Sequence, residues 1–408
     1  MRASYVDRML AQVDGVVAPI WITELIVTDA PPTVDALGLA LARLVREVER
    51  LRLCWDDARV GWRPAPAQRA VPIAVRAAGR AADVIAGLLR DPIDLTVDAP
   101  LRVTLAPLTD RGGATLLALQ LHHAIGDARA LMFLNRRLWQ LLAGTQGEVL
   151  APSAWSDRRA LRAAATHWRA LPQLAHARHR VLARRGTALR RSGDEVGPPM
   201  LRSLRVPLEG DRRPPAERFF AALLAGIAHH GVADPSGAVR FRIPVDLRRE
   251  LDAGPTVDNP CSAIPIELPW ADVAAARDHG ALARRVLDQL ARDLGRGVHW
   301  ATLVECVAIA RVATVAQLRS HTRPELVSAR RGSTLVTTYV GTVDRYFADC
   351  PFPVASLRTH TPTWGANGFV FAGALVVNVG AFEGLWRPDE LDGFVDAMQR
   401  SLGGGEVL

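Results

Sequence analysis

The sequence contains no lysine, so all 50 of its basic residues are arginine. Cysteine is also scarce: the chain of 408 residues has 4 cysteines, and no two of them form a CxxC pair (Cys54, Cys261, Cys306 and Cys350). Zinc sites and disulfide frameworks need cysteines at short, regular spacings. The sequence therefore favours neither, and a reducing cytoplasm is the expected compartment.

Long hydrophobic runs are absent as well. The longest, residues 369–379, is interrupted by Gly373 and Asn378, whereas a membrane-spanning helix needs about 20 apolar residues. The first ten residues include Asp7 and precede no apolar stretch, so we expect neither a signal peptide nor a transmembrane segment. With 49% hydrophobic and 23% charged residues, the composition is that of a globular protein, which we expect to be monomeric.

The order of elements predicts a mixed α/β fold in two parts. At roughly 150 residues per domain, this length suits two or three domains. Strands and helices alternate in both halves, with strands expected at residues 333–340 and 369–379 and a helical stretch at 271–296. Residues 193–199 (GDEVGPP) have the composition of a linker. We therefore expect lobes at residues 1–192 and 200–408.

The positive charge is concentrated in one segment. Residues 158–191 contain ten arginines and no acidic residue, although the net charge of the whole chain is +8. Such a segment attracts an anionic cofactor, an acidic protein, nucleic acid or a membrane surface, and a solvated helix face gives the same pattern. His176 and His179 lie in it without acidic or cysteine neighbours, so no metal site is expected.

One short motif carries most of the chemical information. Residues 116–123 (LLALQLHH) read as a strand and residues 127–142 as a helix, so His123 stands where the strand ends, while His122 points to the opposite face. Asp127 follows four residues later at the expected helix start. A buried histidine and a helix-capping aspartate would explain these residues structurally, but a His-His-x-x-x-Asp pattern arises by chance in only about one such chain in a hundred.

The segment HHAIGDA resembles the HHxxxDG signature of the CoA-dependent acyltransferase superfamily. That superfamily includes condensation domains, wax ester synthases, BAHD and polyketide-associated acyltransferases, and chloramphenicol acetyltransferase. Further stretches are similar to other parts of the family pattern: DPIDLTVDAPLRVTLAPL beginning at Asp91, FRIPVDLR ending at Arg248, VDNPCS around Asn259, and TTYVG at residues 337–341. Together they extend from about residue 20 to 380.

The resemblance implies two chloramphenicol-acetyltransferase-like lobes arranged in a V, with an active-site tunnel between them. His123 would act as the general base for direct acyl transfer, because a neutral imidazole is a good base at cytoplasmic pH. Asp127 would form a structural ion pair with Arg248, and Thr338 would donate a hydrogen bond to the tetrahedral intermediate. The resemblance also implies further substrate-binding positions: His122, Gly126, Ala128, Asn259 and Tyr339.

The implied reaction needs no bound cofactor or metal. The donor is an acyl-CoA or a phosphopantetheine-linked acyl thioester on an acyl carrier protein, and the acceptor is a hydroxyl or amine of a small molecule. Nothing in the sequence decides between an ester and an amide product. No phosphate-binding loop, dinucleotide fingerprint or GxSxG elbow is present.

The sequence departs from the family pattern at two places. Ala128 stands where the signature has glycine, and Tyr339 where a late family segment has asparagine; the BAHD motif DFGWG is absent. No carrier or adenylation segment adjoins, so a free-standing enzyme is expected. The departures leave open a catalytically inactive recruitment module of the same fold. Nucleic-acid binding through the arginine-rich segment is less favoured, because it lacks interleaved aromatic residues and any recognised motif.

Overall fold

The computed structural model describes the chain except for residues 1–2, 15–19, 66–69, 148, 154, 168–171, 173–185, 194, 313, 315, 318–333 and 361–364. It divides into two compact units, each assembled from separate stretches of chain. Unit 1 contains Met1–Asp157, Leu247–Pro260 and Val343–Pro362; unit 2 contains Arg158–Asp246, Cys261–Thr342 and Thr363–Leu408. The segment that we expected to be a linker, 193–199, lies inside unit 2. Among the described residues no helix is long and apolar enough to cross a membrane.

Unit 1 is built on a five-stranded sheet in the order β11-β1-β6-β5-β4. All neighbouring strands are antiparallel except β4 and β5. The strands are β1 (Trp21–Thr28), β4 (Ile73–Val75), β5 (Leu101–Pro107), β6 (Thr115–His122) and β11 (Ser356–His360). Every residue of β1 and β6 is buried, because protein covers both faces of the sheet at its centre. A separate hairpin joins β2 (Leu53–Asp56) to β3 (Gly61–Pro64).

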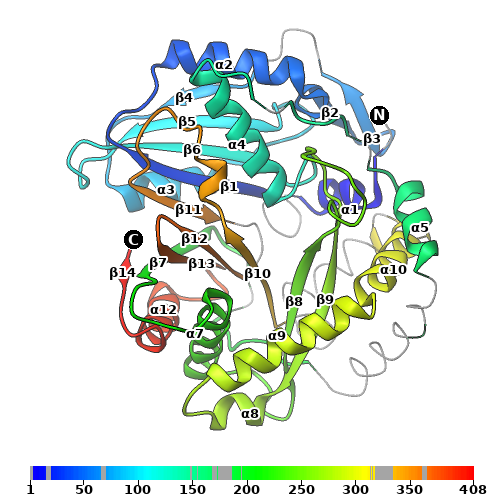
Figure 1. The fold of residues 1–408 in the computed structure, drawn as a ribbon, viewed down its shortest axis with the longest axis vertical. Helices are drawn as coiled ribbons and strands as arrows, with labels where there is room; N and C mark the ends of the chain where they lie inside the picture. Colours follow the sequence, from blue (N-terminus) through cyan, green and yellow to red (C-terminus); the bar gives the residue numbers. More distant parts are fainter. Residues whose placement is uncertain are drawn as a thin grey trace. The chain divides into compact units, whose positions relative to one another are not determined.

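Helices of unit 1 cover this sheet. Helix α2 (Val34–Glu47) begins after Thr33, whose hydroxyl accepts the Ala36 N–H. Helix α4 (Ala128–Leu142) packs beside α2 and presents Asn135 to Glu24 of β1. Helix α3 (Ala81–Arg90) lies on the other face of the sheet, where its Leu88 carbonyl accepts a hydrogen bond from Gln120 of β6 (Figure 1). The remaining helical segments of unit 1 are α1 (Tyr5–Val13), η1 (Glu49–Arg52) and η3 (Asp344–Tyr346).

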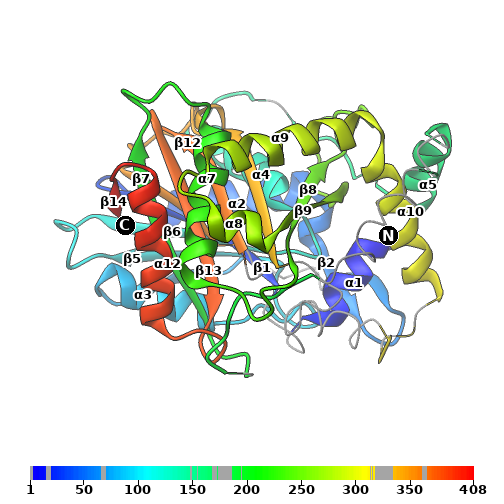
Figure 2. The same ribbon diagram turned by 90° about the horizontal axis from the view of Figure 1, so that it is seen from below.

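Unit 2 contains a seven-stranded sheet in the order β14-β7-β13-β12-β10-β8-β9. Its strands are β7 (Pro199–Pro207), β8 (Ala238–Asp246), β9 (Cys261–Pro269), β10 (Leu335–Thr342), β12 (Gly365–Phe371), β13 (Ala374–Phe382) and β14 (Glu406–Val407). Helices α7 (Pro215–His230) and α12 (Pro388–Ser401) lie together on one face (Figure 2), where Gly226 allows the Phe394 ring to approach closely. The other helices are α8 (Trp270–Ala275), α9 (Gly280–Gly295) and α10 (Val298–Val312), and α5 (Asp157–Thr166) begins at the junction of the units.

Two expected elements are wrong in form. Residues 369–379 are not one strand: they form the tip of the β12–β13 hairpin, in which Ala372 and Gly373 both have positive φ, as a two-residue hairpin turn requires. Residues 271–296 are not one helical stretch, because α8 ends at Ala275 and α9 begins at Gly280. The Asp278 side chain accepts the Gly280 N–H between them.

Candidate active site

His123 lies directly after the last residue of β6, in the turn that leads into α4. β6 ends at His122, which pairs with Trp21 of β1, and α4 begins at Ala128. The loop between them, residues 123–127, is here called the motif loop. The structure thus presents His123 on a tight connection between a buried strand and a buried helix, two rigid supports.

The neighbouring histidine has a structural position. His122 is fully buried, and its Nδ1 accepts the Ala124 N–H at 3.1 Å. The hydrogen of the neutral ring must therefore be on Nε2, which donates to Asp14 Oδ2 at 3.0 Å. Asp14 also accepts the Ile20 N–H, while the Ile20 carbonyl accepts the His123 N–H at 2.9 Å. These bonds anchor the start of the motif loop to the segment that precedes β1.

His123 itself is partly exposed, and its Nδ1 is buried without a hydrogen-bond partner among the described residues. Burial lowers the pKa of His123 below that of a free histidine. The charge of Asp127 and the side chain of Asn259 raise the pKa by smaller amounts, and the neighbouring His122 lowers it slightly. The imidazole is consequently neutral and basic near pH 7.

The structure brings Asp127 and Arg248 together in unit 1. Arg248 Nη1 and Nη2 donate to the two carboxylate oxygens of Asp127, each at 2.9 Å. Asp127 Oδ1 also accepts the Ala130 N–H at 2.8 Å and so caps α4. The Asp127 side chain thus joins Arg248 to the motif loop and to the first turn of α4.

Residues 247–260 hold the motif loop through further contacts. Asn259 Nδ2 donates to the His123 carbonyl at 2.8 Å and to the Ala124 carbonyl at 3.2 Å. The Asp258 carbonyl accepts the Asp127 N–H at 3.3 Å. A Cβ atom added to Gly126 would lie 2.6 Å from that of Ala130, so only glycine fits this turn. Asn259 thus holds two successive carbonyl groups, that of His123 and that of the residue after it.

Two of the expected site residues lie in unit 2. Thr338 and Tyr339 are neighbours in β10; Thr338 is partly exposed and pairs in register with Asn367 of β12. The Tyr339 ring packs beside Phe219 of α7, with ring centroids 6.0 Å apart, and partial burial raises the pKa of its hydroxyl. Their relation to His123 stays a prediction.

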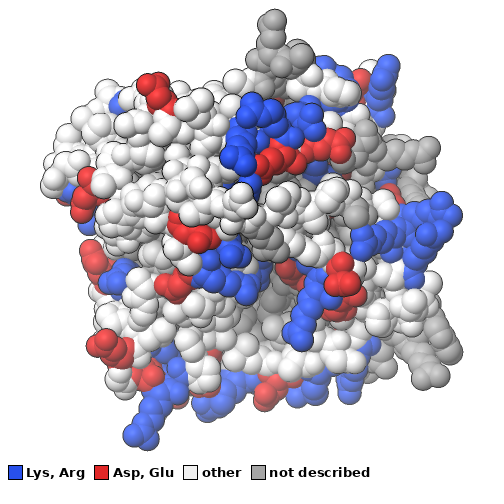
Figure 3. Space-filling view, turned by 45° about the horizontal axis from the view of Figure 1, so that its top comes forward, with Lys and Arg blue, Asp and Glu red and all other residues white. Residues whose placement is uncertain are grey.

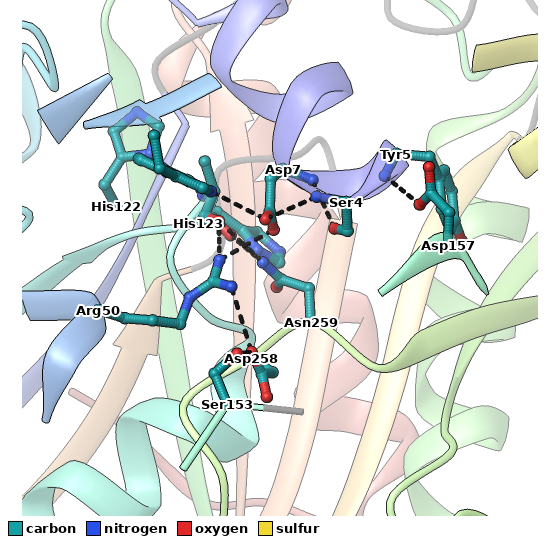
Figure 4. Close-up of polar contacts among 12 residues, drawn as sticks. Ser4, Tyr5, Asp7, Arg50, His122, His123, Ser153, Asp157, Asp258 and Asn259 are labelled. Atoms are coloured by element: carbon teal, nitrogen blue, oxygen red, sulfur yellow. Dashed lines mark hydrogen bonds and ion pairs between the residues drawn. The ribbon is translucent and has the colours of Figure 1, made fainter. Parts of the chain in front are cut away.

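Sequence reasoning missed a group of charged residues around the motif loop. Asp7, Arg50 and Asp258 are buried, and Arg50 contacts the other two and the Ala124 carbonyl (Figure 4). No local pattern indicates this group, because its members come from three distant parts of the chain.

The arginine-rich segment is only partly described. Arg158, Arg159 and Arg162 lie on α5, and Arg190 and Arg191 follow near β7. Five others, Arg169, Arg178, Arg180, Arg184 and Arg185, and both His176 and His179, lie outside the described residues. On the face drawn in Figure 3, arginine side chains stand next to acidic ones. In the part of the chain that the structure describes, no group of side chains could hold a metal ion.

Comparison with known proteins identifies the fold. No protein-family model and no curated protein matches the sequence. Solved structures are similar over nearly the whole chain. Trichothecene 15-O-acetyltransferase from Fusarium sporotrichioides matches with a TM-score of 0.69 and 11% identity, over 98% of this chain and 94% of that chain.

Two condensation domains match equally well in extent. The condensation domain of the monacolin K polyketide synthase matches with a TM-score of 0.67 and 13% identity, over 98% of this chain and 96% of that one. The starter condensation domain of rhizomide synthetase, solved with C8-CoA and Leu-SNAC, matches with a TM-score of 0.62 and 15% identity, over 99% and 94%. The chain therefore shares the mixed α/β fold of these acyltransferases and condensation domains, which confirms the mixed α/β fold expected from the sequence.

Proposed function

We propose that this protein is an acyltransferase that moves an acyl group from a CoA or carrier-protein thioester to a hydroxyl or amine of a small molecule. His123 is the general base in this proposal. In this proposal the donor and the acceptor both reach His123. The cytoplasm, where such thioesters are made, is the proposed compartment.

One observation carries the proposal. His123 is partly exposed and its pKa is lowered, while the polar groups next to it in the loop are already bound: His122 by Asp14, Asp127 by Arg248 and the loop carbonyls by Asn259. A neutral imidazole on a rigidly held loop is what base catalysis at neutral pH requires. The neighbouring His122, by contrast, has both ring nitrogens engaged.

The reaction follows from the properties of this imidazole. Nε2 takes the proton from the acceptor O–H or N–H as the acceptor oxygen or nitrogen attacks the thioester carbonyl carbon. The resulting tetrahedral intermediate collapses by breaking the C–S bond, and the thiolate takes the proton from His123. No covalent acyl-enzyme forms. General base catalysis contributes about 10²–10⁴-fold, and correct orientation of the substrates supplies much of the rest.

Several neighbouring residues have proposed parts in binding. The Thr338 hydroxyl donates a hydrogen bond to the tetrahedral oxyanion, with Tyr339 next to it in the same strand. Gly126 and Ala128 shape the space beside His123, and the methyl group of Ala128 narrows that space slightly. The rhizomide domain, which shares the fold, is described with an acyl-CoA, and this supports a thioester donor.

The test is a survey of donors and acceptors with the purified protein. Acyl-CoAs and acyl carrier proteins are each mixed with alcohol or amine acceptors, and free thiol and product mass are measured. We expect thiol release that depends on the acceptor, and the active donor then shows whether CoA or a carrier protein delivers the acyl group. If a folded protein released no thiol with any of the donors, this would contradict the proposal and favour the recruitment module.

A further inference from the structure

A buried guanidinium lies beneath the motif loop. The Arg50 side chain, from η1, is only 2% exposed. Its Nη2 donates to Asp7 Oδ1 at 2.9 Å and to the Ala124 carbonyl at 3.0 Å, and its Nη1 donates to Asp258 Oδ1 at 3.2 Å. One cation thus joins α1, the motif loop and the 247–260 segment, as Figure 4 shows.

The carboxylate of Asp7 is itself held rigidly. Asp7 is the third residue of α1 and forms a capping box with Ser4: its Oδ2 accepts the Ser4 N–H at 3.0 Å, and its N–H donates to Ser4 Oγ at 3.2 Å. Oδ2 also accepts the Trp62 indole N–H at 3.0 Å. The Trp62 ring supports the guanidinium as well, since Arg50 Cζ lies 5.6 Å from its centroid.

Asp258 is held equally well on the opposite side. Its Oδ1 accepts a hydrogen bond from Ser153 Oγ, and its backbone carbonyl accepts one from Arg248 Nη2 at 2.8 Å. Arg50 is therefore fixed between two carboxylates that cannot follow it if it moves. Because both carboxylates are fixed, the guanidinium of Arg50 is fixed as well. Its position then determines the position of its third acceptor, the Ala124 carbonyl.

That carbonyl belongs to the residue directly after His123. Asn259 Nδ2 also reaches it, at 3.2 Å, so two side chains from different parts of the chain converge on one oxygen. This carbonyl belongs to the peptide unit between Ala124 and Ile125, which is joined through the Ala124 Cα atom to the peptide unit that follows His123, so a shift of the carbonyl is transmitted to the backbone that carries the imidazole. We propose that Arg50 is a positioning residue for His123, which acts through the Ala124 carbonyl and does not touch either substrate.

A matched control is available in the same unit. Arg137 of α4 is 4% exposed and forms a two-point ion pair with Glu47, with bonds of 2.7 and 2.9 Å. Arg137→Met and Arg50→Met each remove a buried guanidinium and leave the carboxylate of its former partner unpaired. Both variants are therefore expected to unfold at a lower temperature, and only Arg50→Met changes the support of the motif loop.

The test measures the pKa of the His123 imidazole directly. The protein is labelled with ¹⁵N-histidine, the His123 signals are assigned from their absence in His123→Ala, and the imidazole pKa is measured by NMR titration. In Arg50→Met we expect the pKa of His123 to rise toward that of a free histidine, because the loosened loop admits water. Arg50→Lys, which keeps the charge but loses the fork of donors, is expected to give a smaller rise. In Arg137→Met the titration is expected to match the wild type.

A kinetic arm rests on the proposed function. For the donor and acceptor found active, kcat should fall at least about tenfold in Arg50→Met while KM of both substrates stays within about twofold. If Arg50→Met does not fold, Arg50→Lys and the nearly isosteric Asp258→Asn take its place. Unchanged His123 titration in the folded Arg50 and Asp258 variants would overturn the inference. A shifted titration in a protein that transfers no acyl group would support the inference and contradict the proposed function.

Discussion

Arg248 holds both carboxylate oxygens of Asp127, through two hydrogen bonds of 2.9 Å, and the two residues are 121 positions apart in the sequence. The same guanidinium donates to the carbonyls of Thr256 and Asp258. One side chain therefore closes the 247–260 segment on itself and attaches it to the loop that carries His123. The pair connects the segments that build the candidate site.

Removing one member of the Asp127–Arg248 pair should lower the stability of the folded protein. Because Arg248 is 5% exposed and Asp127 13%, Arg248→Met leaves a poorly hydrated carboxylate without its partner. We expect a loss of about 3–5 kcal/mol in the free energy of unfolding, measured by urea denaturation. The exposed pair Arg387–Asp389 is the control, where Arg387→Met should lower the free energy of unfolding far less. Equal losses in the two variants would contradict a structural role for the Asp127–Arg248 pair.

The pH dependence of the reaction should reflect the environment of His123. Burial disfavours the imidazolium and lowers the pKa of His123, so the neutral base persists to more acidic pH than in a free histidine. With an alcohol acceptor, which does not titrate in this range, kcat/KM should be flat near pH 7 and decline only below about pH 6.5. If the decline of kcat/KM toward acidic pH were centred above pH 6.5, burial would not control the pKa of the base.

A buried acid in unit 1 makes a separate prediction about stability. Glu24 is fully surrounded by protein, and burial raises its pKa to about 8, against a smaller opposing effect of the nearby Asn135 side chain. The folded protein thus binds a proton that the unfolded chain releases above pH 4.5, so this group makes the stability fall as the pH rises from about 4.5 to 8.

Glu24→Gln should remove that pH dependence. The amide resembles the protonated acid, so we expect stabilisation at pH 7 on the order of 3 kcal/mol at most, and little change at pH 4. Urea denaturation at several pH values measures this change in the free energy of unfolding. Glu209 is exposed, so Glu209→Gln is the control. A gain that is equal at pH 4 and pH 7 would mean that protonation of Glu24 is not the cause.

The motif loop should tolerate no side chain at Gly126. In Gly126→Ala the new Cβ would meet that of Ala130 at 2.6 Å, and neither the loop nor the first turn of α4 can move without disturbing Asp127. We expect a loss of about 1–3 kcal/mol in stability, measured by thermal unfolding. Gly295→Ala is the control, because nothing lies within 4 Å of its Cβ and its φ is not positive. A Gly126→Ala protein as stable as the wild type would contradict the packing described.

The sequence predicted the core of the site because its signals are local. A buried run ending in His122 and His123, followed four residues later by a capping aspartate, is enough to indicate a strand, a turn and a helix, and β6 and α4 lie within a residue of the expected bounds. The motif resemblance then pointed to Arg248 and Asn259, both of which contact the loop.

Other features have no local signal. The Arg50–Asp258 contact joins residues 208 positions apart, and each residue looks like an ordinary surface charge in its own segment. The β12–β13 hairpin escaped detection for a different reason. Both of its strands are buried, and the residues on either side of the turn are apolar, so no polar residue marks the turn within the run 369–379. The turn uses Ala372 in a backbone conformation that favours glycine or asparagine.

The most direct test of the account is the rate of acceptor-dependent thiol release in His123→Ala, compared with the wild type and with His229→Ala, in which an exposed histidine is removed. The account predicts at least about a hundredfold loss of kcat in His123→Ala alone, with an unchanged circular dichroism spectrum. Wild-type activity in the folded His123→Ala protein would contradict it.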